Sequence, residues 1–276
     1  TRFDAIDKTK EYGCQGVELV LDDKTPDGST PMEYAKALTV HANEQGLEVP
    51  IYTTGANFFV KEPEKELERL CRHIDIAAEC KIPLLRHDVA WGYYEGYTGI
   101  KSYKKVIEAV APLVRQAAEY ARERGVKTCS ENHGYLLQDS VRMLELFAAV
   151  DHPNYGFLCD MGNFTVVDED CATAVSALSD YIVHVHAKDM LVRSGMNFDP
   201  GRGYNLSRGG NYWRGTIFGH GNVPTFQILS AIRKSGYDGY VSLEFEGMEP
   251  VLEGVEIGTH NLQHMIEVIG EGQRYV

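Results

Sequence analysis

The sequence of 276 residues has no apolar run long enough to cross a bilayer, no Cys-x-x-Cys pair and no concentration of basic residues. The first absence excludes a transmembrane helix. Without paired spacing, the six cysteines are expected to be buried, reduced thiols of a cytoplasmic protein. The net charge of −13 disfavours nucleic acid and anionic membranes as partners, because either would need a basic face.

What the sequence does contain is a regular alternation of amphipathic and β-branched segments. Helical apolar spacing stops repeatedly at a glycine, as at Gly13, Gly46 and Gly125. We expect helices over residues 3–12, 31–45, 63–80, 103–124, 140–150, 170–178, 224–235 and 255–269, strands over 16–20, 47–53, 82–87, 126–131, 154–160, 181–188 and 240–245, and a long loop over 190–221.

This order predicts an α/β fold. After a first helix, seven strand–helix units follow, and such alternation implies a parallel sheet covered by helices. The length suits a single (β/α)8 TIM-barrel domain over residues 1–276. An eighth strand should precede Thr1 and is not in the sequence, so either the natural start is missing or the barrel is closed in another way.

The stretch 181–189 opens as an apolar run and ends in polar residues. Because strand side chains change face at every residue, His184, His186 and Lys188 share one face. His186 is the histidine nearer the carboxyl end of the strand, where α/β folds place their sites. Each histidine could instead be a hydrogen-bonded residue of the core. The stretch alone therefore does not decide between a functional and a structural role for these histidines.

Three other predicted strands end in a carboxylate, at Glu131, Asp160 and Glu244. A parallel barrel brings the carboxyl ends of its strands to one mouth, where uncompensated carboxylates would repel one another and require a cation. Together with His186 they predict one divalent metal site. The mixed oxygen and nitrogen ligands suit Mn²⁺, our first choice, or Mg²⁺, Co²⁺ or Zn²⁺. Taken singly, each carboxylate could be a surface or turn-capping residue.

Five motifs between residues 126 and 246 carry a family resemblance: Glu131-Asn-His-Gly134, Asp160-Met-Gly-Asn163, His184-Val-His186-Ala-Lys-Asp189, Gly219-His-Gly221 and Tyr237-Asp-Gly-Tyr-Val-Ser-Leu-Glu244. With these motifs the sequence resembles the xylose-isomerase-like TIM-barrel superfamily, which includes ketose 3-epimerases, inosose-processing enzymes and endonuclease IV. The resemblance implies that Glu131, Asp160, His186 and Glu244 hold the metal. It also implies that Glu131 and Glu244 are the catalytic acid/base pair.

The chain departs from the ketose 3-epimerases at three positions. It has Asn163 where they have a histidine, Leu137 where they have a glutamate, and Val192, next to Arg193, where they have an arginine. The set of residues typical of the ketose 3-epimerases is therefore not reproduced at these positions, which argues against a simple ketose as the substrate. The asparagine also argues against endonuclease IV, whose metal cluster needs that histidine.

The expected chemistry is proton transfer next to a carbonyl. A metal acting as a Lewis acid would stabilise an enediolate while carboxylates move the proton. This predicts a metal-dependent isomerase or epimerase of a sugar or keto-sugar. The same enediolate leads to a lyase, such as an inosose or dehydroshikimate-type dehydratase or a β-eliminating deglycosidase of keto-glycosides. A non-catalytic sugar-binding barrel is the third alternative, and two intact glutamates disfavour it.

The expected partner is a small sugar or keto-sugar. The loop over 190–221 carries arginines and aromatics between glycines, so it could act as a lid that binds ligand or as a contact in a homo-oligomer. Glu246 shares a face with Glu244 and is a rival catalytic base. The candidate substrate contacts are His87, Trp91, His133, Lys188, Arg193, His220 and Glu246.

Overall fold

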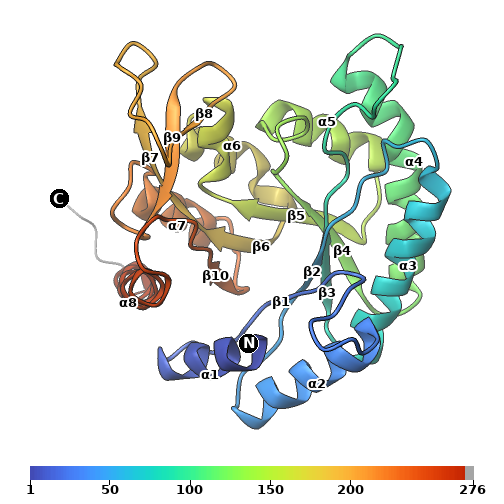
Figure 1. The fold of residues 1–276 in the computed structure, drawn as a ribbon, viewed down its shortest axis with the longest axis horizontal. Helices are drawn as coiled ribbons and strands as arrows, with labels where there is room; N and C mark the ends of the chain where they lie inside the picture. The colour runs from blue at the N-terminus through green and yellow to red at the C-terminus, as the bar shows by residue number, and fades with distance from the viewer. Residues whose placement is uncertain (271–276) are drawn as a thin grey trace. The chain divides into compact units, whose positions relative to one another are not determined.

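The computed structural model describes residues 1–270, and the chain divides into two compact units. The first unit comprises residues 1–137 and 141–157. The second comprises residues 138–140 and, among the described residues, 158–270. Figure 1 follows the chain through both. The sequence prediction of a single domain over residues 1–276 stays a prediction.

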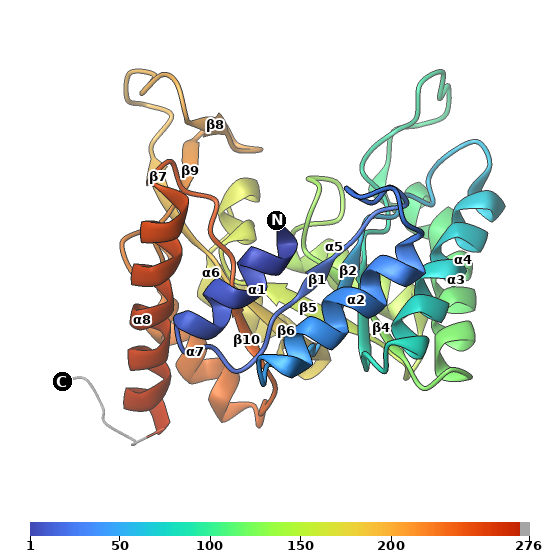
Figure 2. The ribbon, with the colours of Figure 1, turned by 60° about the horizontal axis from the view of Figure 1, so that its bottom comes forward.

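The first unit alternates helices with short parallel strands, which pair in chain order from β1 to β4. Helices α3 and α4 lie side by side in both views (Figures 1 and 2). The elements are α1 (Arg2–Glu11), β1 (Leu19–Val20), α2 (Pro31–Glu44), β2 (Tyr52–Thr54), α3 (Pro63–Glu79), β3 (Leu84–His87), α4 (Tyr103–Arg122), β4 (Lys127–Glu131), α5 (Ser140–Val150) and the first half of β5 (Tyr155–Asp160).

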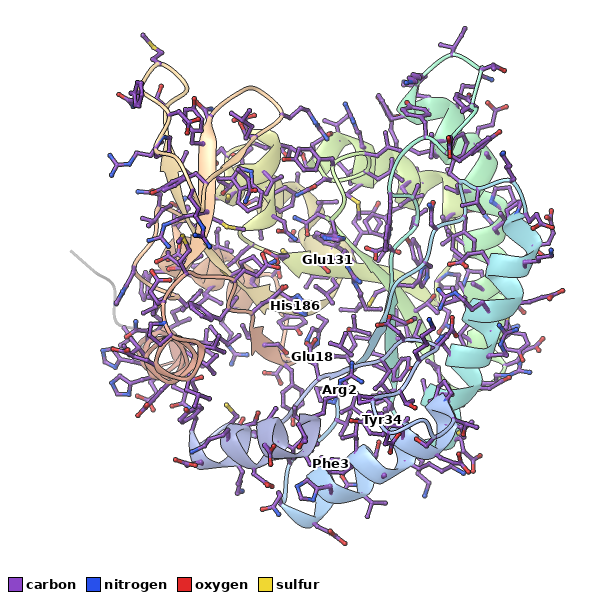
Figure 3. The ribbon with its side chains drawn as sticks, in the orientation of Figure 1. Arg2, Phe3, Glu18, Tyr34, Glu131 and His186 are labelled. Carbon is purple, nitrogen blue, oxygen red and sulfur yellow. The ribbon has the colours of Figure 1, made fainter. Side chains whose placement is uncertain are left out.

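Local capping explains where the first helices begin. The Thr1 and Thr30 hydroxyls each accept a hydrogen bond from the backbone N–H three residues on, and the carboxylate at that position accepts from the threonine backbone N–H in return. Phe3 packs edge to face on Tyr34, with ring centroids 6.1 Å apart, and Arg2 lies over the same ring (Figure 3). These contacts join α1 to α2.

The core of the first unit lies between its helices and strands. Helix α4 contacts β4 and buries one stripe of apolar side chains that recur every three or four residues. Each buried valine of the stripe contributes about 1.5–3 kcal/mol relative to an exposed one. The buried residues are Val106, Ile107, Val110, Ala111, Val114, Ala117, Ala118 and Ala121.

The second unit contains both parallel and antiparallel strands. Its parallel strands follow the order β5-β6-β10, and β7, β9 and β8 form a separate antiparallel sheet. The elements are two short 3₁₀ helices (Asn163–Val167 and Ser179–Tyr181), α6 (Cys171–Leu178), β6 (Ile182–Ala187), β7 (Asp189–Arg193), β8 (Asn205–Leu206), β9 (Tyr212–Thr216), α7 (Thr225–Lys234), β10 (Val241–Leu243) and α8 (Val251–Gly270).

The predicted loop over 190–221 is wrong in part, because it contains most of β7 and all of β8 and β9, which form the antiparallel sheet. Asp189 pairs with Thr216 and Arg193 with Tyr212 across β7 and β9. This pairing joins residues far apart in the sequence, so no local pattern indicates it. Helix α8 also starts earlier than expected, directly after Pro250, whose ring suits the entrance of a helix.

Other expectations from the sequence can be compared with residues 1–270. Seven parallel strands lie among them, and the eighth strand expected before Thr1 stays a prediction. None of the helices in this range combines the length and apolar character that a membrane span requires. All six cysteines are free thiols, three of them buried and three partly exposed.

Candidate active site

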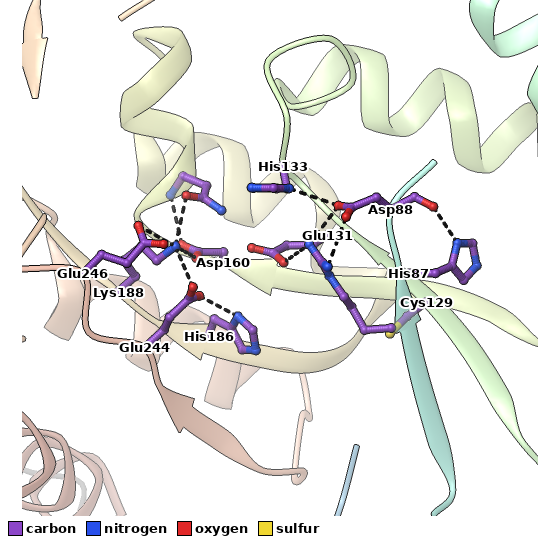
Figure 4. Close-up of polar contacts among 12 residues, drawn as sticks. His87, Asp88, Cys129, Glu131, His133, Asp160, His186, Lys188, Glu244 and Glu246 are labelled. Atoms are coloured by element: carbon purple, nitrogen blue, oxygen red, sulfur yellow. Dashed lines mark hydrogen bonds and ion pairs between the residues drawn. The ribbon is translucent and has the colours of Figure 1, made fainter. Parts of the chain in front are cut away.

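Strand β6 brings its polar residues against β10, as the alternation predicts. The two strands are parallel, with His186 opposite Ser242, and the Glu244 backbone N–H donates to the Ala187 carbonyl. The Nδ1 atom of His186 lies 2.8 Å from Glu244 Oε2 (Figure 4). His184 is two residues earlier on the same face, and its Nε2 atom lies 2.9 Å from the Ser242 hydroxyl. His186, the histidine nearer the carboxyl end of the strand, thus lies beside the Glu244 carboxylate.

Lys188 places a buried ammonium group among three carboxylates (Figure 4). Its side chain is 3% exposed. The Nζ atom lies 3.0 Å from Asp160 Oδ2, 3.0 Å from Glu244 Oε1 and 3.3 Å from Glu246 Oε2. The Asn163 Oδ1 atom is a fourth neighbour at 3.5 Å. A buried charge of this kind is tolerated only when it is paired, and here the pairing is with the predicted site residues.

Asp160 is fully buried at the end of β5, and its own turn fixes the carboxylate. The Oδ1 atom accepts hydrogen bonds from the backbone N–H groups of Gly162 at 2.8 Å and Asn163 at 3.0 Å. A Cβ atom at Gly162 would lie 2.8 Å from the Lys188 carbonyl oxygen, so the close approach of the two segments requires glycine there. The Asp-Met-Gly-Asn motif therefore forms a turn that fixes the orientation of the Asp160 carboxylate.

The pKa of Glu244 reflects this crowding. Burial raises it, but the Lys188 ammonium and the hydrogen bond from His186 outweigh burial and hold the pKa well below its ordinary value. Glu244 is consequently an ionised acceptor at neutral pH. Glu246 is more open, with a side chain that is 51% exposed.

Asp160, His186 and Glu244 fit a divalent ion. Each offers one ligand atom, and these atoms lie within 4.8 Å of one another. Two carboxylates and one imidazole form a ligand set that suits Mn²⁺, Mg²⁺, Co²⁺ or Zn²⁺. The second unit thus brings together three of the four metal ligands that the sequence predicts.

Glu131, the fourth predicted ligand, ends β4 in the first unit and is buried against an arginine. Arg86 Nη2 lies 2.6 Å from Glu131 Oε2 and 2.8 Å from Asp88 Oδ1 (Figure 4). Asp88 in turn lies 3.0 Å from the Nδ1 atom of His133, whose side chain is 49% exposed. The hydrogen bond to Asp88 is the main cause that raises the pKa of His133 above its ordinary value, and burial partly opposes this rise.

The other predicted substrate contacts of the first unit are placed differently. Trp91 is 59% exposed and lies against Gly55, where a Cβ atom would come within 3.3 Å of the indole ring. His87 has no exposed surface and is stacked on Tyr155, with Nδ1 2.8 Å from the Asp88 carbonyl oxygen. Direct contact between His87 and a substrate therefore has no support in the structure.

In the second unit, Arg193 is an exposed residue of β7 in the antiparallel sheet. His220 is exposed in the turn that follows β9. The turn with His220 is fixed by Asp189. The Asp189 carboxylate accepts hydrogen bonds from the backbone N–H groups of Gly219, Gly221, Val223 and Met190, at 2.8 to 3.2 Å. None of the contacts described for residues 1–270 joins Arg193 or His220 to the carboxylate cluster.

Sequence reasoning missed Arg86 and Asp88. Both leave β3 on the same face, and His87 between them points to the other face. The signal was present, since the alternation that selects His186 and Lys188 on β6 also selects Arg86 and Asp88 on β3.

The fold is that of a known family. The family described as "Xylose isomerase-like TIM barrel" matches residues 6–268, so the chain belongs to this family. The TIM-barrel fold and the family resemblance predicted from the sequence are confirmed.

The family contains more than one reaction. An inosose dehydratase from Lacticaseibacillus casei is 28% identical over 142 residues, which are 50% of this chain and 47% of that protein. The chain spans about half the length of the curated relatives it matches.

Solved structures resemble the whole chain. A D-psicose 3-epimerase from Clostridium cellulolyticum, with D-tagatose, has a TM-score of 0.74 at 17% identity and covers 97% of this chain and 93% of its own. A xylose isomerase-like TIM-barrel protein from Mycobacterium smegmatis, in complex with magnesium, has a TM-score of 0.71 at 17% identity, with coverages of 97% and 88%. At these identities the likeness shows the fold alone.

Proposed function

We propose that this chain is a divalent-metal-dependent isomerase or epimerase of a sugar or keto-sugar, which moves a proton on a carbon next to a carbonyl. The observation that carries the proposal is the convergence of Asp160, His186 and Glu244 around the buried Lys188. Such a concentration of carboxylates beside an imidazole is the ligand chemistry of a metal site. The epimerase among the solved structures supports this reaction class.

We assign Asp160, His186 and Glu244 as metal ligands, with Glu131 as the fourth ligand because it also ends a parallel strand. Mn²⁺ is our first choice, and the magnesium complex among the solved structures supports a divalent ion. Such an ion would polarise a substrate carbonyl and so acidify the neighbouring C–H bond.

The chain's own residues would carry the proton. Glu244 is ionised and oriented by His186, so it can accept a proton from the substrate carbon. Glu131, oriented by Arg86, is the proposed partner that returns a proton. Glu246 is the rival base, since it is more open to a ligand and is held by Lys188 at 3.3 Å.

A dehydratase is the second candidate, and the similarity to inosose dehydratase favours it. The two reactions share the removal of a proton next to the carbonyl. They differ in whether a hydroxyl group then leaves from the carbon β to that carbonyl. A β-eliminating deglycosidase differs only in losing a glycoside instead of water.

Incubation of the metal-loaded protein with keto-sugars and inososes in D₂O distinguishes these reactions. Deuterium in a recovered or epimerised sugar, without loss of water, supports the proposed function. An unsaturated or enol product assigns the lyase instead. If none of these compounds incorporates deuterium or gives a product, the proposal is contradicted and a sugar-binding role is favoured. The cytoplasmic location and the homo-oligomer remain predictions.

A further inference from the structure

Lys188 holds the oxygen atoms that a metal ion would need. Its ammonium group lies 3.0 Å from Asp160 Oδ2 and 3.0 Å from Glu244 Oε1, on two of the proposed ligands. Glu246 and Asn163 are also within 3.5 Å. An ammonium group has three hydrogens, so it cannot serve four acceptors fully at one time. One set of partners can therefore be given up without leaving the ammonium group unpaired.

The other oxygen atoms of the same two carboxylates already accept hydrogen bonds or contact an imidazole. Asp160 Oδ1 accepts from the Gly162 and Asn163 backbone N–H groups, and Glu244 Oε2 lies 2.8 Å from His186 Nδ1. The turn at Asp160 is buried and held by these two backbone hydrogen bonds, whereas a lysine side chain has several rotatable bonds. An ion that binds these carboxylates would thus displace the ammonium group more easily than the turn.

The charges around Lys188 match a divalent ion. Asp160, Glu244 and Glu246 carry three negative charges, and Lys188 balances one of them. The remainder equals the charge of a divalent ion when His186 is neutral and Glu131, the proposed fourth ligand, is balanced by Arg86. Without the lysine, three carboxylates would face one another around a largely buried position, which is unfavourable.

We propose that Lys188 is a resident counter-cation that competes with the divalent ion for Asp160 Oδ2 and Glu244 Oε1 and thereby sets the metal affinity of the site. On metal binding, Lys188 shifts to Glu246 and Asn163, the partners that are not metal ligands. The inference rests on the proposed metal site and deepens it, because it names the residue that tunes binding of the ion.

The test is the affinity of metal-stripped protein for Mn²⁺, measured by calorimetry and by electron paramagnetic resonance of the free ion. Lys188→Met should bind Mn²⁺ about tenfold more tightly or better, since even the dielectric constant of water leaves that much repulsion between neighbouring cations. Lys188→Gln keeps a hydrogen-bond donor without the charge and should also bind more tightly. Lys188→Arg keeps the charge and should not. Lys234→Met, at an exposed position on α7, makes the same charge change away from the cluster and should match wild type.

Thermal unfolding provides a second readout. Without metal, Lys188→Met should melt below wild type, and saturating Mn²⁺ should raise its melting temperature more than it raises that of wild type. Circular dichroism checks that each variant is folded. If Lys188→Met does not fold, the Mn²⁺ affinity of Lys188→Gln decides the test. If wild type binds Mn²⁺ and the neutral variants bind it equally or more weakly, the inference is wrong while the metal site stands. If wild type binds no divalent ion, both the site and the inference fall.

Discussion

Arg86 and Glu131 form a buried ion pair, with Arg86 Nη2 2.6 Å from Glu131 Oε2 and less than a tenth of either side chain exposed. The same guanidinium contacts Asp88. Burial lowers the pKa of Arg86, but the carboxylates of Glu131 and Asp88 outweigh burial and raise it above its ordinary value. Arg86 therefore fixes the position of the glutamate that the sequence marks as a catalytic residue.

Arg86→Met should lower the free energy of unfolding by about 3–5 kcal/mol, because it leaves two buried carboxylates without their cation. Chemical denaturation measures the change. The matched control is Arg233→Met, which breaks the exposed pair with Asp238 and should cost at most about 1 kcal/mol. Equal stability of the two variants would show that the buried pair is not a structural requirement.

His87 should make stability depend on pH. Burial lowers its pKa to about 4, below the ordinary histidine value of about 6.5. The folded state thus favours the neutral ring, so the contribution to stability is present above about pH 6.5 and is lost as the pH falls toward about 4.

The prediction compares wild type with His87→Gln, which cannot titrate. From about pH 7 to about pH 5, the free energy of unfolding of wild type should fall by about 2 kcal/mol more than that of the variant. Denaturation curves at the two pH values give the difference. Parallel pH profiles would mean that His87 gains its proton equally well in the folded state.

The helices and the strand ends could be predicted because their signals are local. Caps, glycines and apolar spacing place the helices within a few residues, and Glu131, Asp160 and Glu244 follow apolar strands directly. Pairing between distant segments carries no such signal, so the sheet of β7, β8 and β9 was missed. The contacts of Lys188 depend equally on the ends of β5 and β10. The sequence could place these strand ends in one region but could not orient their side chains.

Asp189→Ala should loosen the turn that carries His220. The substitution leaves the backbone N–H groups of Gly219 and Gly221 without their carboxylate acceptor, at a cost of about 2 kcal/mol or more. Hydrogen exchange of residues 217–223 should become faster. Asp199→Ala, which removes an exposed carboxylate bonded to one backbone N–H, is the control and should leave that segment unchanged. Slow exchange in both proteins would assign the rigidity of the turn to other contacts.

Glu131→Gln and Glu244→Gln should each lower kcat by about 10²–10⁴-fold in the reaction found by the D₂O assay, because amides cannot exchange the substrate proton. Metal content and substrate affinity are measured for each variant, so that loss of the ion is separated from loss of the base. Glu246→Gln is the rival variant. If it is inactive while metal-loaded Glu244→Gln keeps its rate, Glu246 is the base and our assignment is wrong.

The number of divalent ions bound per chain tests the central claim most directly. Purified protein is stripped, saturated with Mn²⁺, freed of excess ion and analysed for metal, beside Asp160→Asn, His186→Ala and the control His264→Ala, which alters an exposed histidine of α8. Wild type and the control should each hold one ion, and the two ligand variants should hold little or none. Full stoichiometric metal in His186→Ala, or none in wild type, would contradict the proposed site.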